Sequence, residues 1–158
     1  MILGRGNSYL GLYLDKKLNW KDRVMKKRKQ MDLRHKEFYW LHGRKSHLSV
    51  DNKLLLYKTR IAPIWTYAIE LWGRACKSNV AVIQRCQSKI LRTILHAQWY
   101  VTNYMIHKDL GSPTVKEVNH ARSIKHLTNS ESHYNPLLQL LPRDNAIRRL
   151  KRRWPADL

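Results

Sequence analysis

The chain has 158 residues, enough for one domain with a modest hydrophobic core, and its formal net charge is +20, from 31 lysines and arginines against 11 acidic residues. Charge of this size destabilises a compact chain unless an anionic partner neutralises it, which favours nucleic acid first and an acidic membrane surface second. Two cysteines are too few for a disulfide framework, and no stretch approaches the ~20 apolar residues of a membrane span, so we expect an intracellular protein, in the nucleus or the cytoplasm.

The N-terminal 18 residues are expected to form a separate, small segment. Residues 1–8 are expected to be an irregular leader. The stretch Tyr9–Leu14 alternates and is rich in leucine and tyrosine, which predicts a short strand or a small β-hairpin that turns at Asp15–Lys17.

A helical period follows, with Asn19 as a candidate N-cap. The apolar residues recur every seventh position: Val24, Met31 and Phe38. This spacing predicts a helix from about Trp20 to Leu41, ending near Gly43. Twelve basic residues but only three acidic ones lie between positions 16 and 45. Solvated helix faces usually balance their charges, and this one does not.

The stretch from Leu48 to Gly73 has the longest apolar face and predicts the central helix. Ser49 is expected to cap its start, and Gly73 is expected to end it in a left-handed conformation. Pro63 lacks an N–H group, which predicts a kink between Thr59 and Pro63, or two helices that abut there. Six residues are expected to share one core: Leu54, Ile61, Ile64, Trp65, Ile90 and Ile94.

Two further helices are expected in the second half of the chain. Asn79 is a candidate cap for a helix that ends near Ala97, with a buried stripe at Ile83, Cys86, Ile90, Ile94 and Leu95 and with Arg85, Lys89 and Arg92 facing outward. An aromatic loop, 98–104, precedes a short helix or turn at 105–110. Thr114 and Glu117 have the spacing of a capping box before a helix over Val115–Leu127.

The remaining residues, 128–158, are expected to form a polar linker and a poorly ordered basic tail. Together these patterns predict a mainly α fold, a small helical bundle, with the short N-terminal strand or hairpin. We expect three parts: an N-terminal segment (1–18), a helical domain (19–127), and a linker with a basic tail (128–158).

No catalytic or metal-binding arrangement stands out in the sequence. Two-metal polymerases hold their cations with paired carboxylates, and no two acidic residues are adjacent in this chain. Cys76, Cys86 and His96 lie ten residues apart, which is not the spacing of a zinc site. We therefore expect no enzyme activity from this chain alone, no metal, no cofactor and no small-molecule substrate.

Several blocks of the sequence resemble one family. NKLLLYKTRIAPIWTYAIELWG (52–73), QRCQSKILRTI (84–94) and WYVTNYMIHKDLGSPTVKE (99–117) are similar to the region after the catalytic core of jockey-like non-LTR retrotransposon reverse transcriptases. YLGLYLDKKLNW (9–20) resembles that family's palm–thumb junction, and PADL (155–158) a motif near its C-terminus. The resemblance implies a truncated C-terminal, thumb-like fragment of an RNA-directed DNA polymerase that lacks the catalytic palm.

The basic helix is the best candidate for a functional surface, because lysine and arginine bind phosphates without reading the sequence. In a polymerase thumb such a helix lies along the template–primer duplex. The candidate contacts to an RNA–DNA hybrid or duplex are Lys26, Lys27, Arg28, Lys29, Arg44 and Lys45.

The alternatives to nucleic-acid binding are a co-opted basic helical adaptor for a protein or another acidic partner, and a surface that is merely basic. A membrane-surface protein is a weaker alternative, and we expect no membrane partner, because the most basic helix has only a narrow apolar stripe. The tyrosines and tryptophan of the 98–104 loop (Trp99, Tyr100 and Tyr104) either stack on bases or serve another role. The oligomeric state is not determined by the sequence.

Overall fold

The computed structural model describes residues 7–9, 12–14 and 19–135. Two short strands, β1 (Asn7–Tyr9) and β2 (Leu12–Leu14), pair in antiparallel fashion, with Ser8 opposite Tyr13. The helices are α1 (Lys21–Glu37), α2 (Tyr39–His42), α3 (Val50–Leu56), the π-helical turn η1 (Tyr57–Ile61), α4 (Ala62–Thr66), α5 (Ile69–Trp72), α6 (Lys77–Leu95), α7 (Asn103–Asp109) and α8 (Val115–Glu131). The predicted turn at 15–17 and the predicted basic tail lie outside the described residues.

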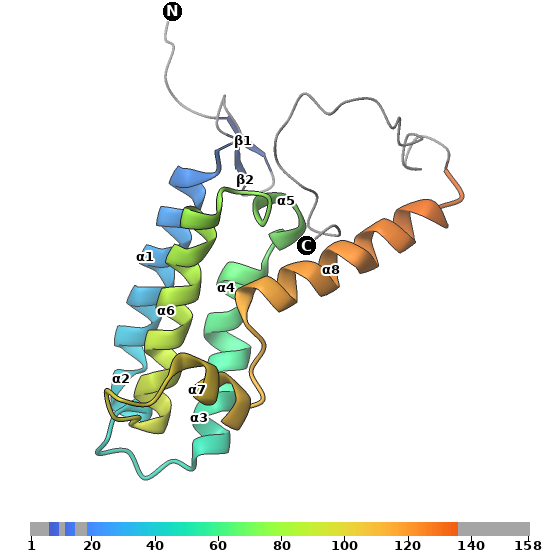
Figure 1. Cartoon of the computed structure of the whole chain (residues 1–158). Helices are drawn as coiled ribbons and strands as arrows, with labels where there is room; N and C mark the ends of the chain where they lie inside the picture. Colours follow the sequence, from blue (N-terminus) through green and yellow to red (C-terminus); the bar gives the residue numbers. More distant parts are fainter. Residues whose placement is uncertain (1–6, 10–11, 15–18, 136–158) are drawn as a thin grey trace, which may run out of the picture.

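The fold is mainly α, as predicted. Helices α1 and α6 lie side by side, and the α3–η1–α4 segment packs against both of them (Figure 1). Helix α7 packs on α6, and α8 contacts α5 and α6 before it extends away from the bundle (Figure 1). The first half of α8 is therefore docked, while its second half projects from the bundle.

Apolar side chains from all of these helices form one core. Its largest fully buried members are Trp65, Trp72, Tyr57, Met31, Ile61, Ile69, Ile83, Ile90, Leu91, Ile94 and Ile106. Five of the six predicted core residues are buried, but Ile64 is only partly buried and packs at the edge of the core. Leu95 is likewise only partly buried. Both residues lie at the edge of their helix's apolar face, where the side chains no longer point into the core.

The caps predicted at Asn19 and Asn79 are wrong. Helix α1 begins after Trp20, whose φ of 59° is left-handed, and α6 begins two residues before Asn79, after Cys76. The Asn79 side chain instead donates a hydrogen bond of 3.0 Å to the carbonyl of Asn19. The two asparagines therefore join the starts of α1 and α6, which is a tertiary role that a local capping rule does not anticipate. The predicted first helix is also divided at Phe38, between α1 and α2.

The central segment begins at the predicted cap, and its α-helical pattern is interrupted close to the predicted position. The Ser49 hydroxyl accepts a hydrogen bond from the Asn52 N–H at 3.4 Å. The π-helical turn η1 then precedes α4, with Pro63 in the first turn of α4. A wider turn accommodates a proline ring because it removes the ring from the carbonyl that it would otherwise crowd.

The end of the central segment differs from the prediction. The chain breaks at Ala68, with a φ of 54°, and Gly73 has a φ of −61°, so Gly73 is not left-handed. A Cβ atom at Gly73 would instead collide with the side chain of Asn119 in α8 and with the carbonyl of Ile69. The Asn119 amide donates a 3.2 Å hydrogen bond to the Gly73 carbonyl. Glycine is required here for the close approach of α8.

The start of α8 confirms the predicted capping box. The Thr114 hydroxyl accepts from the Glu117 N–H at 3.3 Å, and the Glu117 carboxylate accepts from the Thr114 N–H at 2.8 Å. Two glutamines of α6 hold the approach to this helix: Gln84 accepts from the Val115 N–H at 2.8 Å, and Gln87 donates to the Pro113 carbonyl at 2.8 Å. Helix α6 therefore positions both α1 and α8.

Candidate nucleic-acid interface

The basic residues predicted on α1 point in different directions. Lys26, Arg28 and Lys29 are exposed, whereas Lys27 is partly buried, with its Nζ 5.7 Å from the centre of the Tyr67 ring. The buried Arg23 guanidinium lies 5.8 Å from the same ring and donates to the Tyr67 carbonyl at 3.1 Å. Burial, then the charges of Arg23 and Lys26, lower the pKa of Lys27. Lys27 is thus directed toward the α4–α5 junction.

Arg28 lies at the edge of a groove between α1 and α6. This groove, called the α1–α6 groove below, is lined by Arg28, Asp32, Val82, Arg85, Cys86 and Lys89. Its acidic residue, Asp32, lies 3.6 Å from the Arg28 guanidinium and accepts a 3.5 Å hydrogen bond from the Cys86 thiol. Burial and the neighbouring Asp32 carboxylate raise the pKa of Cys86 to about 12. The Asp32 charge is therefore partly neutralised within the groove. Arg85 and Lys89 are the exposed cations that α6 contributes to this groove.

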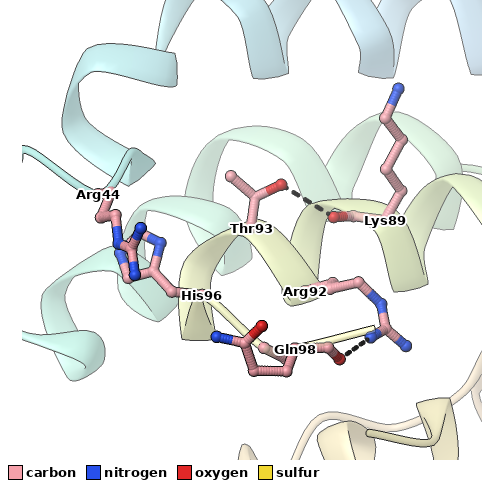
Figure 2. A pocket seen from close by; sticks show the side chains of 7 residues that line it. Arg44, Lys89, Arg92, Thr93, His96 and Gln98 are labelled. Carbon is pink, nitrogen blue, oxygen red and sulfur yellow. Dashed lines mark hydrogen bonds between the residues drawn. The ribbon is translucent and has the colours of Figure 1, made fainter. Parts of the chain in front are cut away.

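A second hollow adjoins this groove, because Lys89 lines both. This hollow, the Arg44 pocket, is lined by Arg44, Lys89, Arg92, Thr93, His96, Ala97 and Gln98. Figure 2 shows Arg44 entering from the turn after α2, while Lys89, Arg92 and His96 come from α6 and its C-terminal end. None of these lining residues is acidic. The pocket therefore offers a site of uniformly positive or neutral side chains.

A further cation lies behind His96, one of the residues that line the Arg44 pocket. Lys53 is only 3% exposed, and its ammonium group donates to the Gly43 carbonyl at 3.4 Å and lies 3.3 Å from His96 Nε2. Burial, followed by the charges of Lys53 and Arg44, lowers the pKa of His96. Lys53, Arg44 and a protonated His96 would repel one another. An anion in the pocket would reduce this repulsion among the three side chains, so the arrangement favours phosphate over a cation or a neutral ligand.

The sequence predicted that Arg92 faces outward, but its side chain instead folds back onto the loop after α6. Its guanidinium donates to the carbonyls of Gln98 and Val101, each at 2.8 Å, and to the Asn103 side chain at 2.9 Å. Helix α6 ends before this loop with His96 in a left-handed conformation, and the Ala97 N–H donates to the Arg92 carbonyl in a Schellman arrangement. Arg92 is therefore both part of the pocket wall and the anchor of the following loop.

Only part of the predicted site comes together in this basic surface. Arg28 lies in the α1–α6 groove and Arg44 in the adjoining pocket. Lys26 and Lys29 line a third, shallow hollow with Met25, which shares Arg28 and Asp32 with the α1–α6 groove. Lys45 is exposed but lines none of these three hollows. Four further residues complete the surface and were not predicted as contacts from the sequence: Arg85, Lys89, Arg92 and His96. Their spacing of three and four along α6 is the signal that could have found them.

Other kinds of site are not supported within residues 7–9, 12–14 and 19–135. No group of three histidine, cysteine, aspartate or glutamate side chains in this part of the chain is placed to hold a metal ion. Among the helices that the structure describes, none is both long enough and apolar enough to cross a bilayer.

Comparison with known proteins identifies relatives for nearly the whole chain. It is 38% identical over 150 residues to a probable RNA-directed DNA polymerase from transposon X-element of Drosophila melanogaster, covering 95% of this chain. It is 33% identical over 145 residues to a probable RNA-directed DNA polymerase from transposon BS of the same species, covering 92% of this chain. It is also 33% identical over 159 residues to the RNA-directed DNA polymerase from mobile element jockey of Drosophila funebris, covering 95% of this chain.

These matches confirm the resemblance to jockey-like retrotransposon polymerases. The chain spans only 16% of the X-element and BS proteins and 17% of the jockey protein. No protein-family model matches the chain. No solved structure matches it significantly.

Proposed function

We propose that this chain binds nucleic-acid backbones without sequence preference, as a thumb-like segment that lies on the template–primer duplex of an RNA-directed DNA polymerase. The observation that carries the proposal is that Lys89 lines both the α1–α6 groove and the Arg44 pocket, so cations of α1, of α6 and of the turn after α2 lie near one another. Polymerisation itself is outside the proposal, because the chain has no adjacent pair of acidic residues to hold two metal ions.

The dimensions of the basic surface suit a duplex. From Arg85 to His96, helix α6 advances eleven residues, which at 1.5 Å per residue is about 17 Å. Duplex DNA of that length carries roughly ten phosphates. Several phosphates therefore lie within reach of the cations along α6, while Arg28 and Arg44 add charge from neighbouring elements.

Salt dependence tests this proposal directly. Fluorescence anisotropy would measure the affinity for duplex DNA and RNA–DNA hybrids of unrelated sequences across a salt series. If Arg85 and Lys89 each contact a phosphate, the variant Arg85→Gln/Lys89→Gln should lower the slope of log affinity against log salt by about 1.8 on duplex DNA, at ~0.9 per contact. All sequences should lose affinity equally, because phosphates carry no base identity. With nucleotides and magnesium present, the bound duplexes should not be extended.

The matched control removes the same charge elsewhere. Lys116→Gln/Lys125→Gln changes two exposed lysines of α8 and should leave the slope nearly unchanged. Circular dichroism and melting would verify that both double variants are folded. Equal slopes for the two double variants would refute a localised basic surface. Comparison of Arg85→Gln/Lys89→Gln with Lys26→Gln/Lys29→Gln would separate the groove from the exposed side of α1.

A basic helical adaptor is the second candidate. The observation that favours it is a set of exposed aromatic side chains, including Trp40, which is 73% exposed, and Trp99, which is 88% exposed. Apolar residues of this size are common anchors at protein interfaces. Absence of nucleic-acid binding by the folded wild-type chain would favour this function over the first.

A further inference from the structure

The loop that follows α6 has a defined conformation. Three hydrogen bonds from Arg92 hold it, to the carbonyls of Gln98 and Val101 and to the Asn103 side chain. The Val101 N–H also donates to the Gln98 carbonyl at 3.1 Å. At the far end, the Thr102 hydroxyl caps α7 by accepting from the Met105 N–H at 3.3 Å. The backbone of residues 98–102, called the Trp99 loop below, is therefore anchored at both ends.

The anchored backbone presents its two aromatic rings to solvent. Trp99 is 88% exposed and Tyr100 is 68% exposed, and their rings meet edge to face with centres 5.9 Å apart. Tryptophan is highly buried on average, so a tryptophan held outward on a fixed loop is unusual. Because the loop is already ordered, a ligand that stacks on these rings loses less free energy to ordering the protein.

The chemistry beside the rings indicates the ligand. Gln98, the residue directly before Trp99, lines the Arg44 pocket together with Arg44, Arg92 and His96. An apolar peptide would gain little from this basic wall, whereas a nucleic-acid strand would place phosphates in the pocket and bases on the rings. Sequence-independent binding of single strands combines these two elements: a positive groove and aromatic stacking.

We infer that the Trp99 loop is a stacking site for unpaired bases of a single-stranded segment whose phosphates occupy the Arg44 pocket. The inference rests on the proposed function only in that both assign the Arg44 pocket to nucleic-acid phosphates. The inference adds a single-stranded ligand to the duplex of the proposed function. Bases inside a duplex are already stacked on their neighbours, so they offer no free face to Trp99. A template overhang next to a duplex held in the α1–α6 groove has the required chemistry.

The test compares two single strands of equal length and charge: an oligothymidylate and an abasic strand with the same phosphates. The wild-type chain should bind the oligothymidylate more tightly. Trp99→Ala should weaken binding of the oligothymidylate at least fivefold, which is about 1 kcal/mol at 1.4 kcal/mol per tenfold change, and should leave the abasic strand unaffected. Tyr134→Ala is the matched control, since Tyr134 is 94% exposed and lies beyond the end of α8.

Each other outcome overturns the inference. Equal wild-type affinities for the two strands would show that bases make no contact, and an unchanged affinity of Trp99→Ala would place the contact elsewhere. An equal loss on both strands would indicate damage to the pocket rather than lost stacking. The proposed function is tested separately. It is refuted if Arg85→Gln/Lys89→Gln and the control Lys116→Gln/Lys125→Gln show equal salt slopes on duplexes, whatever Trp99→Ala does on single strands.

Discussion

Truncation of two isoleucines one turn apart provides a sharp test of the packing. Ile61, the last residue of η1, has no exposed surface, whereas Ile64 in α4 is only partly buried at the edge of the core. The sequence predicted the same core role for both residues. The structure therefore predicts different costs for the same change, Ile61→Ala and Ile64→Ala.

The expected costs follow from burial. Replacing a fully buried isoleucine by alanine removes its transfer free energy and leaves a cavity, which together cost about 2–5 kcal/mol. At Ile64 the neighbouring side chains and water refill the space, so we expect about 1 kcal/mol, near the mean for point substitutions. The intrinsic gain in helix propensity from isoleucine to alanine is the same at both positions and cancels in the comparison.

Urea denaturation followed by circular dichroism would measure both free energies of unfolding. With a denaturant slope of ~1–3 kcal/mol per molar, Ile61→Ala should lower the urea midpoint by about 1 M or more, and Ile64→Ala by clearly less. A chain of this length should lose roughly 2–4 °C in melting temperature per kcal/mol. Equal losses for the two variants, or a larger loss at Ile64, would contradict the assigned orientation of the central segment.

Two further predictions concern α8 and pH. Gly73→Ala should destabilise the fold by about 1–3 kcal/mol, because a Cβ atom there collides with Asn119, and Gly73→Ala/Asn119→Ala should recover part of the loss in the same denaturation assay. Burial is the main cause that lowers the pKa values of His35 and His42 below 6.5, so the unfolded chain binds more protons than the folded one as the pH falls through 6.5. The free energy of unfolding should therefore reach a plateau above about pH 7 and fall below about pH 6.5, and His35→Gln/His42→Gln should flatten this dependence; an unchanged slope would assign it to other groups.

Local sequence signals predicted much of the fold. The stripe of Ile83, Cys86, Ile90 and Ile94 identified the buried face of α6, and Ser49 and the Thr114–Glu117 pair marked two helix starts correctly. These features depend on residues within one or two turns of one another, so the pattern along the chain contains the required information.

The errors have a common cause. Asn19 and Asn79 looked like local caps, yet they bond to each other across 60 positions. Gly73 does end a helix, but it is not left-handed as predicted, and its missing side chain instead admits α8. Nothing adjacent in the sequence distinguishes these roles. Whether a polar or small residue serves its own helix or a distant one depends on which elements pack together.

For the candidate site, composition, periodicity and shared motifs indicated a strongly basic, helix-rich chain that is similar to retrotransposon polymerases, because these are properties of the linear chain. Tertiary packing set which cations lie near one another. It turned Lys27 toward Tyr67 and brought Arg28, Lys89 and Arg44 to one surface from three elements. The physical reason is that electrostatic attraction for phosphate depends on distances in space, and those distances are set by the packing of α1 against α6.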